Sequence, residues 1–222
     1  MKYNHIKYYF STAILLTTIW CCNNKQEKSK QVDTSAKVEI NESKKTTNEE
    51  EKYILFFGNS LTAGYGLEEG YGYPELIQKR LDSLDFNYKV VNAGLSGETS
   101  AGGLGRIDWV LKQPVDVFVL ELGANDALRG LDLDQTISNL RGILLKVKEK
   151  GEIPIVIAGM EAPPNMGANY TNRFRNIFPT LADEFDAGLI PFLLDGVAGI
   201  DSLNIADGIH PNEKGYQIVQ EN

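Results

Sequence analysis

Beyond residue 50, short apolar runs alternate with longer segments whose apolar residues recur at helical spacing. The short runs are rich in Val, Ile, Leu and Phe and lack polar alternation, which is typical of strands buried on both faces of a parallel sheet. The strands predicted from these runs are residues 53–57, 88–92, 115–121, 153–159 and 188–194. The helices predicted from the longer segments are residues 73–81, 103–113, 134–150, 169–185 and 212–220.

Alternation of strand and helix, repeated five times, predicts an α/β fold with a doubly wound five-stranded parallel sheet and helices on both faces. In such sheets, active sites form beyond the carboxyl ends of the strands. Ser60 follows the first predicted strand, Gly97 the second and Asn125 the third. The segment from Asp207 to His210 follows the fifth predicted strand. We therefore expect these residues to meet at one edge of the sheet.

The first 22 residues have the pattern of a targeting segment. Lys2 and Lys7 accompany a mostly apolar stretch at residues 8–20, which is too short to span a bilayer comfortably. The segment ends at Cys21 and Cys22, the only two cysteines of the chain. It resembles a bacterial lipoprotein signal, with Cys22 (or Cys21) as the lipid acceptor. An ordinary cleaved signal peptide and a short N-terminal anchor are the alternatives.

Residues 23–50 contain no aromatic side chain, and six lysines balance six acidic residues there. Because so polar a segment cannot bury a core, we interpret it as a disordered tether that leads to one domain at residues 51–222. Eight of the 22 basic and six of the 30 acidic residues lie in residues 1–50, so residues 51–222 carry ten more acids than bases. This excess argues against nucleic acid as a partner.

Residues 51–222 contain a single histidine, His210, three residues after Asp207. Far upstream, the apolar run 53–57 gives way to a turn that contains Ser60. A serine, a histidine and an aspartate are the components of a hydrolytic triad, whose members must be adjacent in space but can be far apart in the sequence. Since the domain offers no second imidazole, the general base is either His210 or not a histidine.

Four short blocks occur in order along the chain: Gly58-Asn59-Ser60-Leu61, Ser96-Gly97-Glu98-Thr99, Gly123-Ala124-Asn125-Asp126 and Asp207-Gly208-Ile209-His210. Together they resemble the SGNH or GDSL hydrolases, and the resemblance covers nearly all of residues 53–217. Longer words around Ser60, Asn125 and His210 look like the branch that holds acyl-CoA thioesterase I, lysophospholipase L1 and arylesterases. Residues 160–167 are similar to a loop of its arylesterase-like members.

The resemblance implies a role for each block. Ser60 would be the nucleophile, His210 the base that takes its proton, and Asp207 the carboxylate that orients the imidazole. The backbone N–H groups of Ser60 and Gly97 and the side-chain amide of Asn125 would form the oxyanion hole. We expect Asp126, beside Asn125, to buttress its loop.

Two features depart from the family pattern. Asn59 stands where the family usually has Asp, so the shape and one acceptor are kept while the negative charge is lost. That position is outside the triad, and we expect activity to survive the change. Only twelve residues follow His210, whereas relatives often have a longer final helix, so we expect the catalytic loop to be held less firmly.

Sites for metals and cofactors are not expected. The chain has no Walker-type phosphate loop, and its glycine cluster at residues 102–105 lacks dinucleotide spacing. One histidine without a cysteine in the domain does not make a zinc site. We interpret Asp126, Asp132 and Asp134 as solvated loop acids rather than as a cation site.

We therefore predict a serine esterase that hydrolyses small acyl or aryl esters, lysophospholipid or thioesters through an acyl-serine intermediate. An apolar groove for the substrate is expected to be lined by Leu128, Leu131, Leu133, Pro163, Pro164 and Met166. The alternatives are a carbohydrate O-acetyl esterase and a non-catalytic lipoprotein module that binds a ligand. The predicted location is the bacterial cell envelope, where the protein would be a lipid-anchored monomer, either periplasmic or surface-exposed. Acyl-CoA would not be available there.

Overall fold

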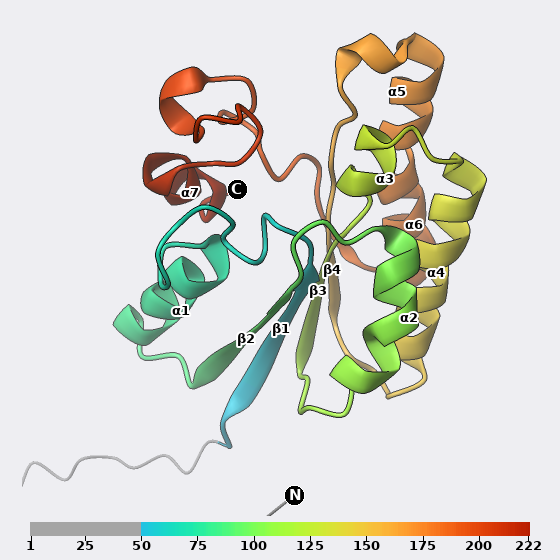
Figure 1. The fold of residues 1–222 in the computed structure, drawn as a ribbon. Helices are drawn as coiled ribbons and strands as arrows, with labels where there is room; N and C mark the ends of the chain where they lie inside the picture. The colour runs from blue at the N-terminus through green and yellow to red at the C-terminus, as the bar shows by residue number, and fades with distance from the viewer. Residues whose placement is uncertain (1–49) are drawn as a thin grey trace, which may run out of the picture. The chain divides into compact units, whose positions relative to one another are not determined.

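The computed structural model describes residues 50–222. The predicted signal segment, the lipidated cysteine and the tether up to residue 49 lie outside the described residues. Five parallel strands form one sheet in the order β2-β1-β3-β4-β5 (Figure 1). The strands are β1 (Lys52–Gly58), β2 (Tyr88–Gly94), β3 (Val117–Glu121), β4 (Ile155–Ala158) and β5 (Gly188–Ile190).

Helices cover both faces of this sheet. On one side lie α1 (Tyr73–Ser83) and α7 (Glu213–Val219); on the other lie α2 (Ser100–Val110), α4 (Leu133–Lys148) and α6 (Ile177–Phe185) (Figure 1). The shorter elements are α3 (Ala124–Leu128), α5 (Ala168–Arg175) and two 3-10 turns, η1 (Pro164–Met166) and η2 (Asp201–Leu203). The predicted α/β class with a five-stranded parallel sheet is confirmed.

The predicted helix 169–185 is two helices, because proline interrupts it. Pro179 has no N–H with which to bond the carbonyl of Arg175, four residues earlier, and Asn176 joins α5 to α6 at that point. Proline also shortens the last strand. β5 ends at Ile190, and Pro191 turns the chain so that the N–H of Leu193 bonds to the carbonyl of Gly159. Residues 191–194 therefore leave the sheet and pass to its carboxyl edge.

The core is centred on β1 and β3. Leu55, Phe57 and Phe118 have no exposed surface, since helices pack on both faces of these central strands. The expectation that all five strands are fully buried is wrong for β2 and β5. They are the two edge strands, and their residues are half-buried or exposed.

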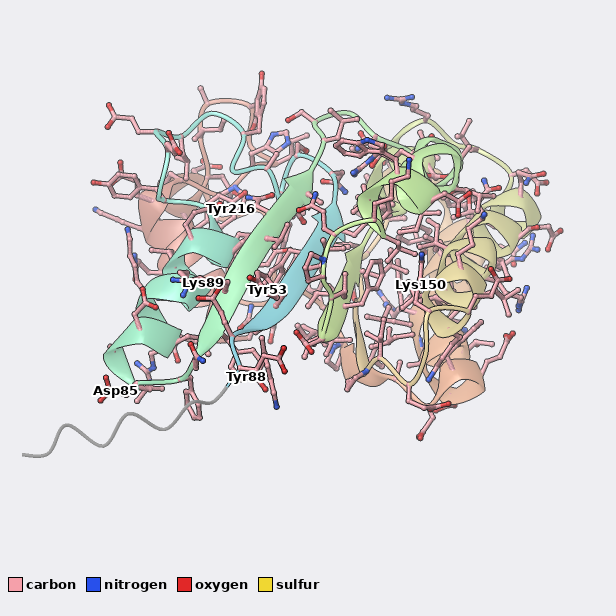
Figure 2. The ribbon with its side chains drawn as sticks, turned by 90° about the horizontal axis from the view of Figure 1, so that it is seen from below. Tyr53, Asp85, Tyr88, Lys89, Lys150 and Tyr216 are labelled. Carbon is pink, nitrogen blue, oxygen red and sulfur yellow. The ribbon has the colours of Figure 1, made fainter. Side chains whose placement is uncertain are left out.

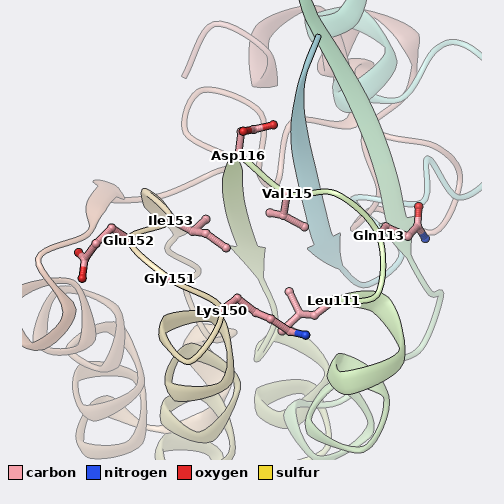
Figure 3. Close-up of a pocket in the computed structure, with 8 residues that line it drawn as sticks. All are labelled: Leu111, Gln113, Val115, Asp116, Lys150, Gly151, Glu152 and Ile153. Atoms are coloured by element: carbon pink, nitrogen blue, oxygen red, sulfur yellow. The ribbon is translucent and has the colours of Figure 1, made fainter. Parts of the chain in front are cut away.

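The amino-terminal edge of the sheet faces the viewer in Figure 2, where Tyr53 and Tyr88 lie near the starts of β1 and β2. A shallow cavity of about 290 Å³ lies at this edge (Figure 3). It is lined by Leu111, Gln113, Val115, Asp116, Lys150, Gly151, Glu152 and Ile153. Asp116 is already engaged there, since it accepts a hydrogen bond of 2.7 Å from the Tyr53 N–H. Within residues 50–222, no helix has the length and apolar character needed to cross a membrane.

Candidate active site

Ser60 lies on a tight turn that leaves the carboxyl end of β1. The N–H of Ala63 bonds to the carbonyl of Asn59 at 3.0 Å, and the N–H of Tyr65 bonds to the carbonyl of Ser60 at 3.0 Å. Asn59 Oδ1 accepts from the Leu61 N–H at 3.0 Å, which closes the turn from inside. The strand order reverses between β1 and β3, so the turn stands at the position where open α/β sheets bind ligands.

The fold brings Ser60, His210 and Asp207 together across 150 residues of sequence. Ser60 Oγ lies 2.8 Å from His210 Nε2, and His210 Nδ1 lies 2.6 Å from Asp207 Oδ2. Ser60 is largely buried, with 9% of the residue exposed, and the His210 side chain is 14% exposed. The distances suit proton transfer from the hydroxyl to the imidazole, with the carboxylate at the other ring nitrogen.

The Asp207 carboxylate is held in the loop that carries His210. Its Oδ1 accepts from the N–H groups of Ile209, at 3.0 Å, and of His210, at 3.1 Å. Partial burial acts to raise the pKa of Asp207, but the hydrogen bonds from Ile209 and His210 outweigh it and lower the pKa overall. The lowered pKa keeps the Asp207 carboxylate ionised at neutral pH, where it can accept a hydrogen bond from the ring nitrogen Nδ1 of His210.

The C-terminal helix ties this loop to the Ser60 turn. Asn212 caps α7 by accepting from the N–H groups of Lys214 and Gly215, at 3.0 and 3.1 Å. The buried Tyr216 hydroxyl donates to the Leu61 carbonyl at 2.8 Å. Although α7 is short, it links the two halves of the site directly.

The predicted oxyanion donors face the same space as Ser60. Gly97 has a φ of +79°, a conformation that favours glycine, so its N–H can turn toward the substrate. Asn125 lies in the first turn of α3, and its Nδ2 donates one hydrogen to the Glu98 carbonyl at 3.0 Å. An amide nitrogen carries two hydrogens, so this bond fixes the side chain and leaves the second hydrogen for a ligand. Sequence reasoning did not predict α3.

An ion pair fastens the loop between β2 and α2 to the sheet. Arg106 Nε donates to Glu98 Oε1 at 2.7 Å, and its Nη2 donates to the carbonyls of Ala93, at 2.8 Å, and Gly58, at 3.3 Å. The guanidinium stacks 4.1 Å from the centre of the Phe57 ring. Because the Glu98 carbonyl also holds Asn125, the Arg106–Glu98 ion pair connects this predicted oxyanion donor to the ends of β1 and β2.

A cavity of about 730 Å³ opens at Ser60, His210, Gly97 and Asn125. Three residues of the predicted groove, Leu128, Pro163 and Pro164, line it. Apolar lining residues that sequence reasoning missed are Leu61, Tyr65, Ala124, Met160, Ala162, Phe192, Leu194, Ala198 and Ile209. Phe192 and Leu194 reach the cavity because the chain leaves β5 early at Pro191. Pro191 itself was the available signal, since proline inside a predicted strand argues that the strand ends there.

The other predicted groove residues lie outside this lining. Leu133 is 2% exposed and packs in the core as the first residue of α4. The Met166 methyl group faces Gly130, where a Cβ would lie 3.3 Å from it, so Met166 packs against the neighbouring loop. Leu131 is 40% exposed, and its carbonyl accepts from the Tyr170 hydroxyl at 3.0 Å. These three residues support the rim rather than the cavity.

Tyr65 packs against the imidazole, with 4.8 Å between the ring centres of Tyr65 and His210. Its position five residues after the serine was the only available signal, and sequence reasoning did not use it.

The acidic side chains near α3 are used structurally. Asp126 is 2% exposed and accepts from Ser100 N at 2.8 Å and from Ser100 Oγ at 2.5 Å. The interpretation of Asp126 as solvated is wrong, while its buttressing contacts match the other expectation. Asp132 caps α4, and Asp134 pairs with Arg173. In residues 50–222, no group of three or more His, Cys, Asp or Glu side chains is arranged to hold a metal ion.

Comparison with known proteins matches residues 56–218 to the GDSL-like lipase/acylhydrolase family. The chain is 39% identical to Esterase TesA of Pseudomonas aeruginosa over 159 residues, which cover 71% of this chain and 79% of that protein. It is 38% identical to Thioesterase 1/protease 1/lysophospholipase L1 of Escherichia coli, over 76% of this chain and 79% of that protein. The crystal structure of AlinE4, an SGNH-hydrolase family esterase, superposes with a TM-score of 0.69 at 43% identity, covering 78% of this chain and 93% of that chain.

Proposed function

The chain belongs to the GDSL-like lipase/acylhydrolase family and is a carboxylic ester hydrolase, and from this premise we propose that it cleaves small acyl and aryl esters and lysophospholipids through an acyl-Ser60 intermediate. The observation that carries the proposal is the continuous contact from Ser60 Oγ to His210 Nε2, at 2.8 Å, and from His210 Nδ1 to Asp207 Oδ2, at 2.6 Å. These three groups face one cavity, where an ester can reach the hydroxyl.

In the first half of the reaction, Ser60 Oγ attacks the ester carbonyl carbon while His210 Nε2 takes the hydroxyl proton. Asp207 accepts from His210 Nδ1–H, which keeps Nε2 free as the acceptor and stabilises the imidazolium that forms. The imidazolium then gives its proton to the leaving alcohol oxygen as the carbon–oxygen bond breaks. In the second half, water attacks the acyl-serine, with His210 taking one water proton and returning it to Ser60 Oγ.

The negative charge that develops on the carbonyl oxygen falls near the N–H groups of Ser60 and Gly97 and the amide of Asn125. Donors fixed in advance stabilise this charge without reorganising during the reaction, and one such donor is typically worth about 2.7–4 kcal/mol. The bond from Asn125 to the Glu98 carbonyl supports this assignment, because it removes the rotational freedom of the amide.

The substrate class rests on the shape and chemistry of the cavity. About 730 Å³ with walls of Leu128, Phe192, Leu194 and Ile209 suits an acyl chain or an aryl group. The same volume exceeds what an acetyl group needs, so we favour longer acyl and aryl esters over acetylated sugars. The name of the Escherichia coli relative includes a lysophospholipase and a thioesterase, and both substrate classes fit such walls.

The test is turnover of p-nitrophenyl butyrate by the purified protein and by Ser60→Ala, with Ser83→Ala as a matched control. Ser83 lies on the exposed end of α1, where its hydroxyl bonds to the Arg80 carbonyl, so its loss should not affect turnover. We expect Ser60→Ala to be inactive and Ser83→Ala to keep the wild-type turnover, because only Ser60 supplies the attacking hydroxyl. Turnover retained in Ser60→Ala would reject the acyl-serine mechanism.

The substrate class needs its own comparison. A panel of p-nitrophenyl esters of increasing chain length, lysophosphatidylcholine and acetylated xylan should show preference for chains longer than acetyl. Hydrolysis of acetylated xylan alone would instead support a carbohydrate O-acetyl esterase.

We also propose that the protein is a monomeric lipoprotein of the cell envelope, anchored through Cys22 (or Cys21) and a polar tether over residues 23–50. The support is the sequence pattern of the first 22 residues and the polar composition that follows it. Metabolic labelling with a fatty-acid analogue should label the wild type. A Cys21→Ser/Cys22→Ser double variant should remain unlabelled, and equal labelling of both would contradict the anchor.

A further inference from the structure

Glu121 is a buried carboxylate that the mechanism above does not use. It is the last residue of β3, has no exposed surface, and pairs in register with Gly58 at the end of β1. None of the ion pairs found within residues 50–222 includes Glu121. An unexposed acid without a cation must be stabilised by hydrogen bonds, and those bonds indicate what it does.

The carboxylate of Glu121 receives its hydrogen bonds from the Ser60 turn. Its Oε1 accepts from Asn59 Nδ2 at 2.6 Å, and its Oε2 accepts from the Asn59 N–H at 3.1 Å and from Thr62 Oγ1 at 2.9 Å. The Thr62 N–H is a further donor to the carboxylate. A Cβ on Gly58 would lie 2.6 Å from Glu121 Oε2 and 2.0 Å from Thr62 Oγ1. Glycine is therefore needed at position 58 to leave room for the carboxylate beneath the turn.

Asn59 transmits this contact to the nucleophile. Its Oδ1 accepts from the Leu61 N–H at 3.0 Å and lies 3.3 Å from Ser60 Oγ. The opposite amide orientation would bring Asn59 Oδ1 against the carboxylate oxygen and Nδ2 against the Leu61 N–H, so both contacts would become repulsive. The ionised carboxylate thus fixes the amide with its oxygen toward Ser60.

We propose that Glu121 is a positioning residue for ester hydrolysis: its ionised carboxylate, acting through Asn59, holds the Ser60 turn in the conformation in which the hydroxyl meets His210. The inference rests on the proposed role of Ser60. It also accounts for Asn59, because the negative charge that this position lacks lies one hydrogen bond away, on Glu121.

The charge of Glu121 changes near neutral pH. Burial raises the pKa of Glu121 to about 7, against the lowering effect of the hydrogen bonds from Asn59 and Thr62. Protonation would remove acceptor capacity from a carboxyl group that faces several donors of the turn. The proposed active form therefore needs Glu121 ionised and His210 neutral.

The other titratable groups around the turn keep one charge state near pH 7. The Tyr73 hydroxyl forms a hydrogen bond of 2.8 Å with Thr62 Oγ1, and the Tyr216 hydroxyl donates to the Leu61 carbonyl. Burial, followed by the charges of Glu121 and Glu75, raises the pKa of the Tyr216 hydroxyl, and burial and Glu121 raise that of Tyr73. Both phenols stay neutral, and the lowered pKa of Asp207 keeps that carboxylate ionised as well. The ionisation of Glu121, together with the need for an unprotonated His210 Nε2 in the mechanism, therefore shapes the acid side of the pH profile.

The experiment compares the pH profile of kcat/KM for wild type, Glu121→Gln and, as a control, Glu184→Gln. Glu184 is an exposed acid of α6 that pairs with Arg141, so the same chemical change there should have no effect. On the acid side, log kcat/KM of the wild type should approach a slope of about two, because two groups must lose protons. In Glu121→Gln the slope should fall to about one, with kcat at pH 8 roughly 10- to 100-fold lower and KM nearly unchanged.

A folded Glu121→Gln variant with the wild-type kcat and the wild-type acid slope would overturn the inference. If that variant does not fold, the pH profile of Thr62→Val tests the inference instead. The Thr62 hydroxyl lowers the pKa of Glu121, so its removal should move the acid limb to higher pH, whereas Thr62→Ser should leave the limb in place. An unmoved limb in Thr62→Val would also overturn the inference. Activity in Ser60→Ala would reject the proposed function itself, so the two failures are distinguishable.

Discussion

Replacing Arg106 by leucine should destabilise the domain far more than the same replacement at a surface arginine. Arg106 holds Glu98 by two nitrogen atoms and also donates to the carbonyls of Gly58 and Ala93. The Glu98 side chain is 3% exposed and that of Arg106 is 21% exposed, so water replaces little of what is lost. Leucine keeps part of the apolar packing on Phe57 and removes the charge.

The magnitude follows from the burial of Glu98. Removing one partner of a buried ion pair leaves the other charge uncompensated, which costs about 3–5 kcal/mol of the free energy of unfolding. Arg141 makes the same two-nitrogen contact with Glu184, at 2.7 and 2.8 Å, but the two side chains are 37% and 39% exposed. Water compensates both charges there, so Arg141→Leu should cost less than about 1 kcal/mol.

The assay is urea unfolding at pH 7 of wild type, Arg106→Leu and the matched Arg141→Leu. The free energies of unfolding are compared only if the three proteins show the same dependence of that free energy on urea concentration. Combining Arg106→Leu with Glu98→Leu should recover part of the loss, because the double variant has no unpaired charge. A coupling energy of roughly 2 kcal/mol is expected from this cycle. Equal losses at Arg106 and Arg141, or a coupling energy near zero, would refute the reasoning.

Three further outcomes are expected. Asn125→Ala should lower kcat for p-nitrophenyl butyrate about 100- to 1000-fold with little change in KM, and a change confined to KM would contradict its role as an oxyanion donor. Because burial raises the pKa of Glu121 from 4.5 to about 7, the folded state holds that proton more tightly. This contribution to stability is complete below pH about 4.5 and is lost as the pH rises through about 7, a loss of roughly 3 kcal/mol. Urea unfolding of wild type and Glu121→Gln should therefore give a difference that varies between pH 5 and pH 8, and a constant difference would show that the acid is not perturbed. Tyr65→Leu should lower kcat/KM about threefold, because the aromatic face beside His210 stabilises the imidazolium that forms during the attack; an unchanged kcat/KM would exclude that interaction.

The strands and the edge that carries the site could be predicted because their signals are local. The apolar run before Ser60 has no polar alternation, and parallel strands place all their carboxyl ends on one side of a sheet. Knowing that Ser60, Asn125 and His210 each follow a strand was therefore enough to expect them near one another. The resemblance to a known family supplied their proposed roles.

The remaining parts depend on proline and on contacts that no sequence window contains. Pro179 divides the predicted helix 169–185, and Pro191 ends the last strand and directs Phe192 into the cavity. Glu121 reads in the sequence as the polar end of a buried strand. The role we propose for Glu121 depends on its hydrogen bonds to the turn at Asn59. That turn is 62 residues away in the sequence and adjacent only in the folded protein.

The groups of the proposed triad come from the two ends of the domain's sequence, since Ser60 follows β1 and His210 follows β5. A polypeptide still growing on the ribosome has its hydroxyl long before it has an imidazole, and it cannot act on an ester. A proteolytic cut that removes the segment from Asp207 onward would likewise end turnover, because it removes the imidazole and its carboxylate together. Ester turnover therefore indicates that the chain has folded from Ser60 through to His210.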